Sequence, residues 1–167
     1  MNIQLIPSND GLKGIALPLI QAFWECHNQY TQEFEETLKD YEDWTKEGHL
    51  LYLVKLDGVY VGFAHLGNRG ANIDWLEDLF VLPEYQNKGI GSQTITLLEE
   101  EVKKYSESLY IEVAARNFNA MKLYRRVGYD CLNTITIRKD FHPEEFTALS
   151  NENIAGMDFE IRKYIEK

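Results

Sequence analysis

The chain has 167 residues, of which 44% are hydrophobic, 26% are charged and 13% are aromatic. This length and composition predict one globular domain with one core and exclude a disordered or fibrous protein. The formal net charge of −10 argues against nucleic acid as a partner, because a phosphate backbone needs a basic surface.

The sequence shows no feature of a secreted, membrane or metal-binding protein. The N-terminal residues lack a basic segment followed by a long apolar one, and no apolar run reaches membrane-spanning length. Neither Cys26 nor Cys131 lies in a CxxC or a metal-ligand spacing. The four histidines, His27, His49, His65 and His142, are scattered and are expected to be structural or exposed. We therefore expect a reduced, cytoplasmic protein with no membrane contact and no metal.

The first half of the chain predicts a strand, two helices and a β-hairpin. Residues 3–6 predict a short strand, and residues 11–30 predict a helix that starts or kinks at Pro18. Residues 31–47 predict a second helix. The runs 49–56 and 59–66 are joined by Asp57-Gly58, which is typical of a hairpin turn.

The second half alternates between strands and helices. Strands are predicted at 73–82, 109–115, 131–139 and 157–164, and helices at 89–105 and 119–127. The order predicts an α/β (α+β) fold, in which helices cover both faces of a mixed central sheet of about six to seven strands.

The segment from Leu79 to Ser92 carries the clearest chemical signal. A strand runs into a loop, and Gly89 and Gly91 then open a helix. The first amides of a helix have no internal partner, and the helix dipole adds positive potential, so this turn suits an anion. The alternative is a tight turn that binds nothing, because Gly-x-Gly alone is a weak motif.

This segment resembles a signature of the GNAT family of N-acetyltransferases. Gln86-Asn87-Lys88-Gly89-Ile90-Gly91 matches its Gln/Arg-x-x-Gly-x-Gly/Ala pattern, and Val81-Leu82-Pro83 matches the family's Val-x-Pro. A second block, from Glu112 to Tyr129, resembles the family's Asn-x-x-Ala-x-x-Leu-Tyr-x-x-x-Gly-Phe/Tyr pattern. The close resemblance spans residues 50–140 and implies a single GNAT domain over 1–167.

The resemblance implies acetyl-CoA as the co-substrate and identifies the residues that bind it. The loop from Asn87 to Ser92 would hold the pyrophosphate, and the backbone at 79–81 would hold the pantetheine arm. The implied binding residues are Leu79, Phe80, Val81, Gln86, Asn87, Lys88, Gly89, Ile90, Gly91, Ser92, Asn117, Ala120 and Tyr124.

Two of these residues also have a purely structural interpretation. Asn117 has an amide suited to the pantetheine arm, but it is equally a good helix N-cap. The family pattern makes Tyr124 the donor of a proton to the leaving thiolate, and a buried aromatic ring would also suit its position.

The reaction also needs a proton acceptor, because only a neutral amine attacks the thioester. Glu112 is the first candidate, since a glutamate placed like this is the base in the ribosomal-protein branch of the family. Glu77 is the second candidate. Strand alternation would put Glu77 and Asp78 on opposite faces unless a bulge intervenes. Each acid has the alternative of an ordinary strand-end carboxylate.

The acceptor is expected to be a small cationic amine. Acids exceed bases between Glu25 and Glu47, and Glu33, Glu36 and Asp40 share one helical face that would form an acidic wall. The alternative is a solvated helix face. A protein N-terminus or lysine as acceptor, and a CoA-binding module without catalysis, remain alternative functions. The C-terminal region often shapes a dimer contact in this family, so a homodimer is a further expectation.

Overall fold

The structure is a computed structural model that describes residues 1–165 of the chain. It divides into two compact units, Met1–Glu112 and Val113–Lys167. Each unit is described by itself. Among residues 1–165, no helix combines the length and apolar character that crossing a membrane requires.

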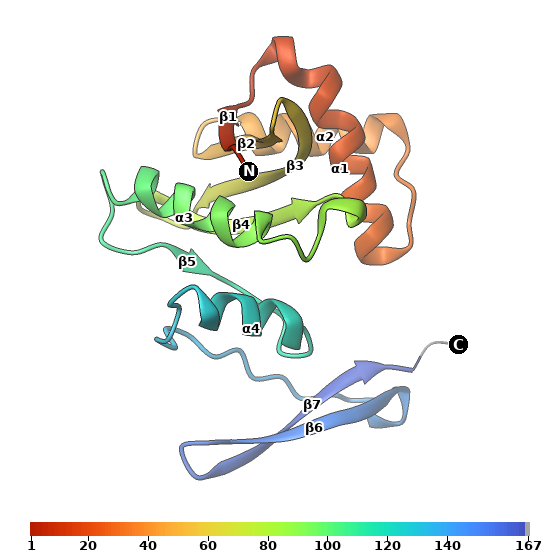
Figure 1. Cartoon of the computed structure of the whole chain (residues 1–167). Helices are drawn as coiled ribbons and strands as arrows, with labels where there is room; N and C mark the ends of the chain where they lie inside the picture. Colours follow the sequence, from red (N-terminus) through yellow and green to blue (C-terminus); the bar gives the residue numbers. More distant parts are fainter. Residues whose placement is uncertain (166–167) are drawn as a thin grey trace. The chain divides into compact units, whose positions relative to one another are not determined.

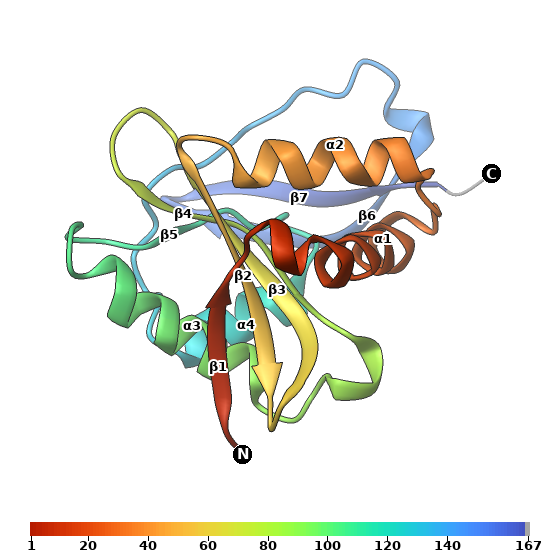
Figure 2. The ribbon, with the colours of Figure 1, turned by 90° about the horizontal axis from the view of Figure 1, so that it is seen from above.

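The first unit is built on a five-stranded sheet in the order β1-β2-β3-β4-β5 (Figure 1). Its strands are β1 (Ile3–Pro7), β2 (His49–Leu56), β3 (Val59–Asn68), β4 (Ile73–Val81) and β5 (Tyr110–Ile111). The first four strands pair antiparallel, and β5 is parallel to β4. Figure 2 shows β1, β2 and β3 side by side, with the predicted hairpin turn between β2 and β3.

Helices cover both faces of this sheet, as predicted (Figure 1). The helices α1 (Lys13–Asn28) and α2 (Phe34–Thr45) pack on one face, and α3 (Ile90–Val102) packs on the other. Adjacent strand residues point to opposite faces. Leu53, Phe63 and Phe80 therefore join the core under α1 and α2. Their neighbours Val54 and Val81 join Ile90 of α3.

The two N-terminal helices differ from the expectation in detail. The helix α1 begins at Lys13 and runs through Pro18, so Pro18 does not mark its start. A capping box of Glu33 and Glu36 begins α2. The buried residues of α2 are Thr37, Tyr41 and Trp44, whereas Phe34 is 59% exposed.

The second unit contains α4 (Phe118–Arg126) and a separate two-stranded sheet of β6 (Phe146–Ile154) and β7 (Met157–Tyr164). The short helices η1 (Asp10–Leu12), η2 (Pro83–Tyr85) and η3 (Pro143–Glu145) complete the described elements. The strand predicted at 131–139 was wrong, since those residues carry no strand. A strand needs a hydrogen-bonding partner as well as alternation, and β7 takes β6 as its partner.

The mixed α/β fold is thus confirmed, but the seven strands divide into a sheet of five and a sheet of two. The polar run before Ala155 hid β6 from the sequence pattern. Ala155 and Gly156 both have positive φ angles, 51° and 81°, and form the two-residue turn between β6 and β7. Such turns are typical of hairpins.

Candidate functional site

A turn at the end of β4 leads into α3 and contains the predicted phosphate-binding residues. The Leu82 N–H donates to the Val61 carbonyl at 2.8 Å, which ties the start of the turn to β3. The side chain of Gln86 reaches back, and its Nε2 donates to the Val81 carbonyl at 2.8 Å. The motif glutamine therefore fixes the turn against the end of β4.

The backbone of this turn takes left-handed angles at two positions. The φ angle is 59° at Asn87 and 81° at Gly89. Gly89 is the N-cap of α3, and no side chain caps this helix. A Cβ built on Gly89 would meet no atom within 4 Å, so the space beside it is open.

The N-terminus of α3 presents backbone donors. Its first helical hydrogen bond runs from the Gln93 N–H to the Gly89 carbonyl at 3.1 Å. The N–H groups of residues 90–92 precede that bond, and such groups lack a partner inside the helix. Lys88 Nζ instead donates to the Glu84 carbonyl at 2.7 Å. The anion-binding character of this turn therefore comes mainly from its backbone and the helix dipole.

The edge of β4 that faces β5 is open over much of its length. The strand β5 pairs only with Trp75 and Leu76 of β4. In the described chain, residues 79–81 therefore have a strand partner on the β3 side alone. An extended ligand with amide groups can pair with such an edge.

A bulge at Glu77 interrupts the pairing of β3 with β4. His65 lies opposite Asp78 and Leu66 lies opposite Leu76, so Glu77 is an extra residue in β4. Asp78 bonds to His65, while a Cβ built on Gly67 would lie 3.0 Å from Glu77 Cγ. His65 and Gly67 are two residues apart on β3 and share a face. The bulge thus places Glu77 and Asp78 on the same face.

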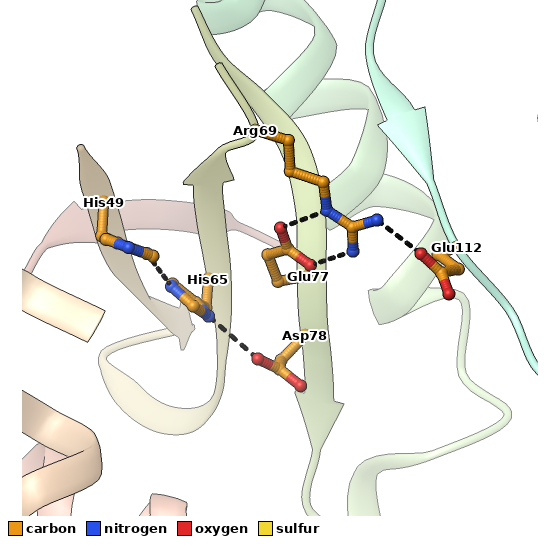
Figure 3. Close-up of polar contacts among 6 residues, drawn as sticks. All are labelled: His49, His65, Arg69, Glu77, Asp78 and Glu112. Carbon is orange, nitrogen blue, oxygen red and sulfur yellow. Dashed lines mark hydrogen bonds and ion pairs between the residues drawn. The ribbon is translucent and has the colours of Figure 1, made fainter. Parts of the chain in front are cut away.

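The two predicted bases, Glu77 and Glu112, share Arg69 as a partner (Figure 3). Arg69 donates from Nε to Glu77 Oε1 at 2.9 Å and from Nη2 to Glu77 Oε2 at 2.6 Å. Its Nη1 donates to Glu112 Oε2 at 2.5 Å. Hydrogen bonding to Arg69 lowers the pKa of Glu77, although burial opposes this effect.

Two stacked rings support Arg69. Its guanidinium carbon lies 4.1 Å from the centre of the Trp75 ring, and Trp75 stacks on Tyr110 with centroids 4.9 Å apart. Trp75 and Tyr110 are also opposite each other in the short β4–β5 pairing. The ion pairs therefore lie where β5 leaves β4 and the open edge begins.

A second polar group joins three strands on the α2 side of the sheet (Figure 3). His49 Nδ1 lies 2.9 Å from His65 Nε2, and His65 Nδ1 lies 2.9 Å from Asp78 Oδ2. No sequence pattern indicated this group, because 16 residues separate the histidines and no motif contains them. His27 packs against Phe23 with ring centroids 4.7 Å apart, and His142 is exposed.

The second unit holds the remaining motif residues. Asn117 is the N-cap of α4, and its Oδ1 accepts a hydrogen bond from the Ala120 N–H at 3.2 Å. This cap uses the oxygen of the Asn117 amide and not its NH₂ group. Tyr124 lies on the same helix, and its ring centroid is 6.1 Å from that of Tyr129.

The acids of the predicted acidic wall have local structural partners. Glu33 and Glu36 form the capping box of α2, and Glu36 also accepts from the Tyr30 hydroxyl at 2.6 Å. Asp40 Oδ2 accepts from Trp24 Nε1 and Gln32 Nε2, each at 2.7 Å. These acids therefore have a structural role, because they connect α2 to α1 and to the segment between the two helices.

Comparison with known proteins finds a family model that matches most of this chain. A model described as "Acetyltransferase (GNAT) family" matches residues 17–129. That range includes β4, the turn that leads into α3, α3 itself, Asn117 and Tyr124. Among solved structures, the aminoglycoside acetyltransferase AAC(6')-Iy in complex with a bisubstrate analogue of CoA superposes with a TM-score of 0.65. The match covers 84% of this chain and 99% of that one, at 20% identity, and supports the fold.

Curated relatives match over part of their length. A Bos taurus thialysine N-epsilon-acetyltransferase is 33% identical over 59% of this chain and 56% of its own. An Escherichia coli K12 [ribosomal protein bS18]-alanine N-acetyltransferase is 35% identical over 41% of this chain and 45% of its own. A Bacillus subtilis spermine/spermidine N(1)-acetyltransferase is 31% identical over 50% of this chain and 62% of its own. The chain thus spans about half the length of these relatives.

Proposed function

We propose that this chain, which belongs to the acetyltransferase (GNAT) family, transfers the acetyl group of acetyl-CoA to a primary amine. One observation carries the proposal. The open edge of β4 is followed, after η2 and a short turn, by the uncapped N-terminus of α3. An extended, amide-containing arm and an anionic group can therefore bind to one continuous segment of backbone.

The residues present fit the CoA part of the donor. The backbone of Leu79, Phe80 and Val81 would pair with the pantetheine arm. The amides from Asn87 to Ser92 would hold the pyrophosphate, with open space beside Gly89 to admit it. Gln86 would act indirectly, by holding the turn on Val81. Asn117, Ala120 and Tyr124 complete the binding set by the family pattern.

Acetyl-CoA supplies a thioester whose acetyl carbon an amine can attack directly, so no acetylated residue of this chain is needed. Tyr124 would then give a proton to the departing thiolate. Glu112 and Glu77, which share Arg69 at the start of the open edge, are the carboxylate candidates for receiving the proton of the acceptor. Glu77, the more strongly held by Arg69, would also stay charged and attract an ammonium group.

The acceptor proposed is a small cationic amine. Glu77, Asp78 and Glu112 all lie at the start of the open edge, and among residues 1–165 Arg69 is the one cation bonded to two of them. The names of the bovine and Bacillus relatives, which refer to thialysine and to spermine or spermidine, agree with this choice. The Escherichia coli relative supports the alternative of a protein N-terminus. We also retain a single domain over 1–167, a cytoplasmic location and a homodimer as proposals.

The test is release of free CoA thiol from acetyl-CoA with a panel of amines. The panel contains spermidine, thialysine, an aminoglycoside and a peptide with N-terminal alanine. We expect thiol release with at least one of the three small cations and a matching acetylated product by mass spectrometry. Turnover of the peptide alone would favour the protein-acceptor alternative. If no amine releases thiol while acetyl-CoA still raises the melting temperature, the chain is a CoA-binding module.

A further inference from the structure

The chain of contacts from His49 through His65 to Asp78 has a defined direction. An ionised carboxylate only accepts hydrogen bonds, so His65 Nδ1 donates to Asp78 Oδ2. With His65 as a neutral imidazole, which has one donor and one acceptor nitrogen, His65 Nε2 accepts from His49 Nδ1. The remaining nitrogen, His49 Nε2, therefore carries an unprotonated lone pair. In the described residues, no hydrogen-bond partner is found for it.

Packing holds the His49–His65–Asp78 group in place. His65 is only 3% exposed and stacks on Trp44 of α2 with ring centroids 4.9 Å apart and planes 15° apart. His65 and Asp78 are directly opposite each other in the β3–β4 register. His49 is partly exposed at the start of β2. In this group of three residues, His65 is therefore buried and held in one orientation, whereas solvent or substrate can reach His49.

The charges around His49 keep it in the form that can accept a proton. Burial lowers its pKa, and the nearby His65 and Lys46 of α2 lower it further, while Glu77 of β4 and Asp43 of α2 oppose them. Its pKa thus lies below the ordinary value near 6.5. His49 is mainly neutral at pH 7.

Glu77, one of the two glutamates named above, is a weaker proton acceptor than a neutral imidazole. Arg69 bonds to both oxygens of Glu77 and to one oxygen of Glu112. Its hydrogen bonds lower the pKa of Glu77. A base transfers protons best when its pKa lies near the working pH. An imidazole meets this condition better than a carboxylate bound to guanidinium.

The His49–His65–Asp78 group also lies beside the proposed path of acetyl-CoA. With the pyrophosphate at residues 87–92, the pantetheine arm would run back along β4 from Val81 to Leu79. The next residue in that direction is Asp78, followed by Glu77 at the bulge. The thioester end would therefore arrive at the face where Asp78 meets His65.

We propose that His49 Nε2 takes the proton from the acceptor ammonium, and that His65 and Asp78 are positioning residues that hold His49 in the required tautomer. This rests on the proposed acetyl transfer to an amine. The nitrogen–hydrogen bond of the ammonium breaks, and its proton bonds to His49 Nε2. The electron pair left on the amine nitrogen attacks the acetyl carbon. The imidazolium is stabilised through His65 by Asp78, and its proton then leaves to solvent from the exposed end.

An activity-independent measurement tests the geometry. In protein labelled with ¹⁵N at histidine, the ring nitrogens of His49 and His65 report which one carries hydrogen. We expect the Nδ1–H tautomer for both at pH 7.5, assigned by comparison with His49→Gln. Asp78→Asn should disturb the tautomer of His65, because an amide can donate where the carboxylate only accepts. An Nε2–H tautomer at His49 in the unaltered protein would overturn the assignment.

Kinetic measurements test the role of His49 as the proton acceptor. His49→Gln should lower kcat/KM at pH 7 by about 100-fold or more, the usual range for a general base. Activity should recover towards pH 10, where the amine loses its proton without help. Acetyl-CoA should still raise the melting temperature. Asp78→Asn should show a smaller loss with the same recovery, and His142→Gln, the same change at an exposed histidine, should behave as the unaltered enzyme.

The outcomes separate this inference from the function on which it rests. If the unaltered protein acetylates an amine and His49→Gln keeps its full pH–rate profile, His49 is not the acceptor although the function stands. If Glu112→Gln instead produces the loss at pH 7 and the recovery at pH 10, the proton goes to Glu112 and the inference is overturned. A protein that acetylates no amine overturns both.

Discussion

Gly62 of β3 and Phe80 of β4 lie so close that a Cβ built on Gly62 would sit 2.1 Å from the Phe80 carbonyl oxygen. No side chain fits at that distance without moving the backbone of β4. Residues 79–81 are the open edge proposed for the pantetheine arm. This close approach therefore sets the position of the edge as well as the packing of the sheet.

The first prediction is that Gly62→Ala destabilises the protein and weakens acetyl-CoA binding together. Overpacking of this kind costs about 1–3 kcal/mol, and relief of the clash displaces β4. Thermal unfolding and calorimetric titration with acetyl-CoA measure the two effects. Gly14→Ala in α1 is the matched control, because a Cβ there meets nothing within 4 Å. A Gly62→Ala protein with unaltered stability would contradict this account.

The second prediction separates backbone strain from blocked binding. Gly89 and Gly58 have φ angles of 81° and 94°, and a Cβ on either meets nothing within 4 Å. Leucine at either position should cost a similar 1–2 kcal/mol, roughly, because of the left-handed backbone. Only Gly89→Leu should also abolish the melting-temperature increase that acetyl-CoA causes. Equal ligand effects in both variants would remove the phosphate role from this turn.

The third prediction concerns Tyr124. Tyr124→Phe should keep acetyl-CoA affinity and lower kcat about 10- to 1000-fold, because only the proton donor is lost. The measurement is single-turnover acetylation, which isolates the chemical step. Tyr164→Phe, in which a hydroxyl donor to Glu145 is removed, is the control in the same unit. An unchanged single-turnover rate would make Tyr124 a packing residue.

The fourth prediction is a pH dependence of stability that comes from His49. Its pKa in the folded protein is lowered, mainly by burial, so the unfolded chain binds this proton more readily. The contribution of neutral His49 to stability is full above about pH 6.5 and is lost as the pH falls through the folded pKa. Urea unfolding between pH 5 and 8 should show this acid loss. His49→Gln should reduce it, and His142→Gln should not.

The fifth prediction concerns the charge of the acceptor. For spermidine, kcat/KM should fall as salt rises from 20 to about 200 mM, because ions screen its attraction to the acids near the open edge. A monoamine of similar length should show a weaker dependence. Neutralising Glu33, Glu36 and Asp40 is a poor test, since these acids cap and brace α2. A salt-independent kcat/KM for spermidine would remove the electrostatic argument.

Local sequence was sufficient for the parts of the site that lie on one segment. The turn proposed to bind phosphate and the start of α3, with Gly89 and Gly91, are consecutive in the sequence. The end of the strand, the turn and the start of the helix could therefore be predicted from neighbouring residues. The hairpin at Asp57-Gly58 was predicted for the same reason. The prediction of a strand at 131–139 was wrong because alternation is a property of one segment, whereas a strand also needs a second segment to pair with.

The tertiary structure alone decided which side chains meet. The simple hairpin register from the Asp57-Gly58 turn would place Leu50 opposite His65 and turn His49 to the other face. A bulge near Val54 shifts the register by one residue, so Leu51 lies opposite His65 and His49 shares its face. The bulge at Glu77 likewise turns Glu77 and Asp78 to one side. Composition and motif place residues along the chain, but a one-residue slip between strands reverses a face, and only the packed sheet fixes that slip.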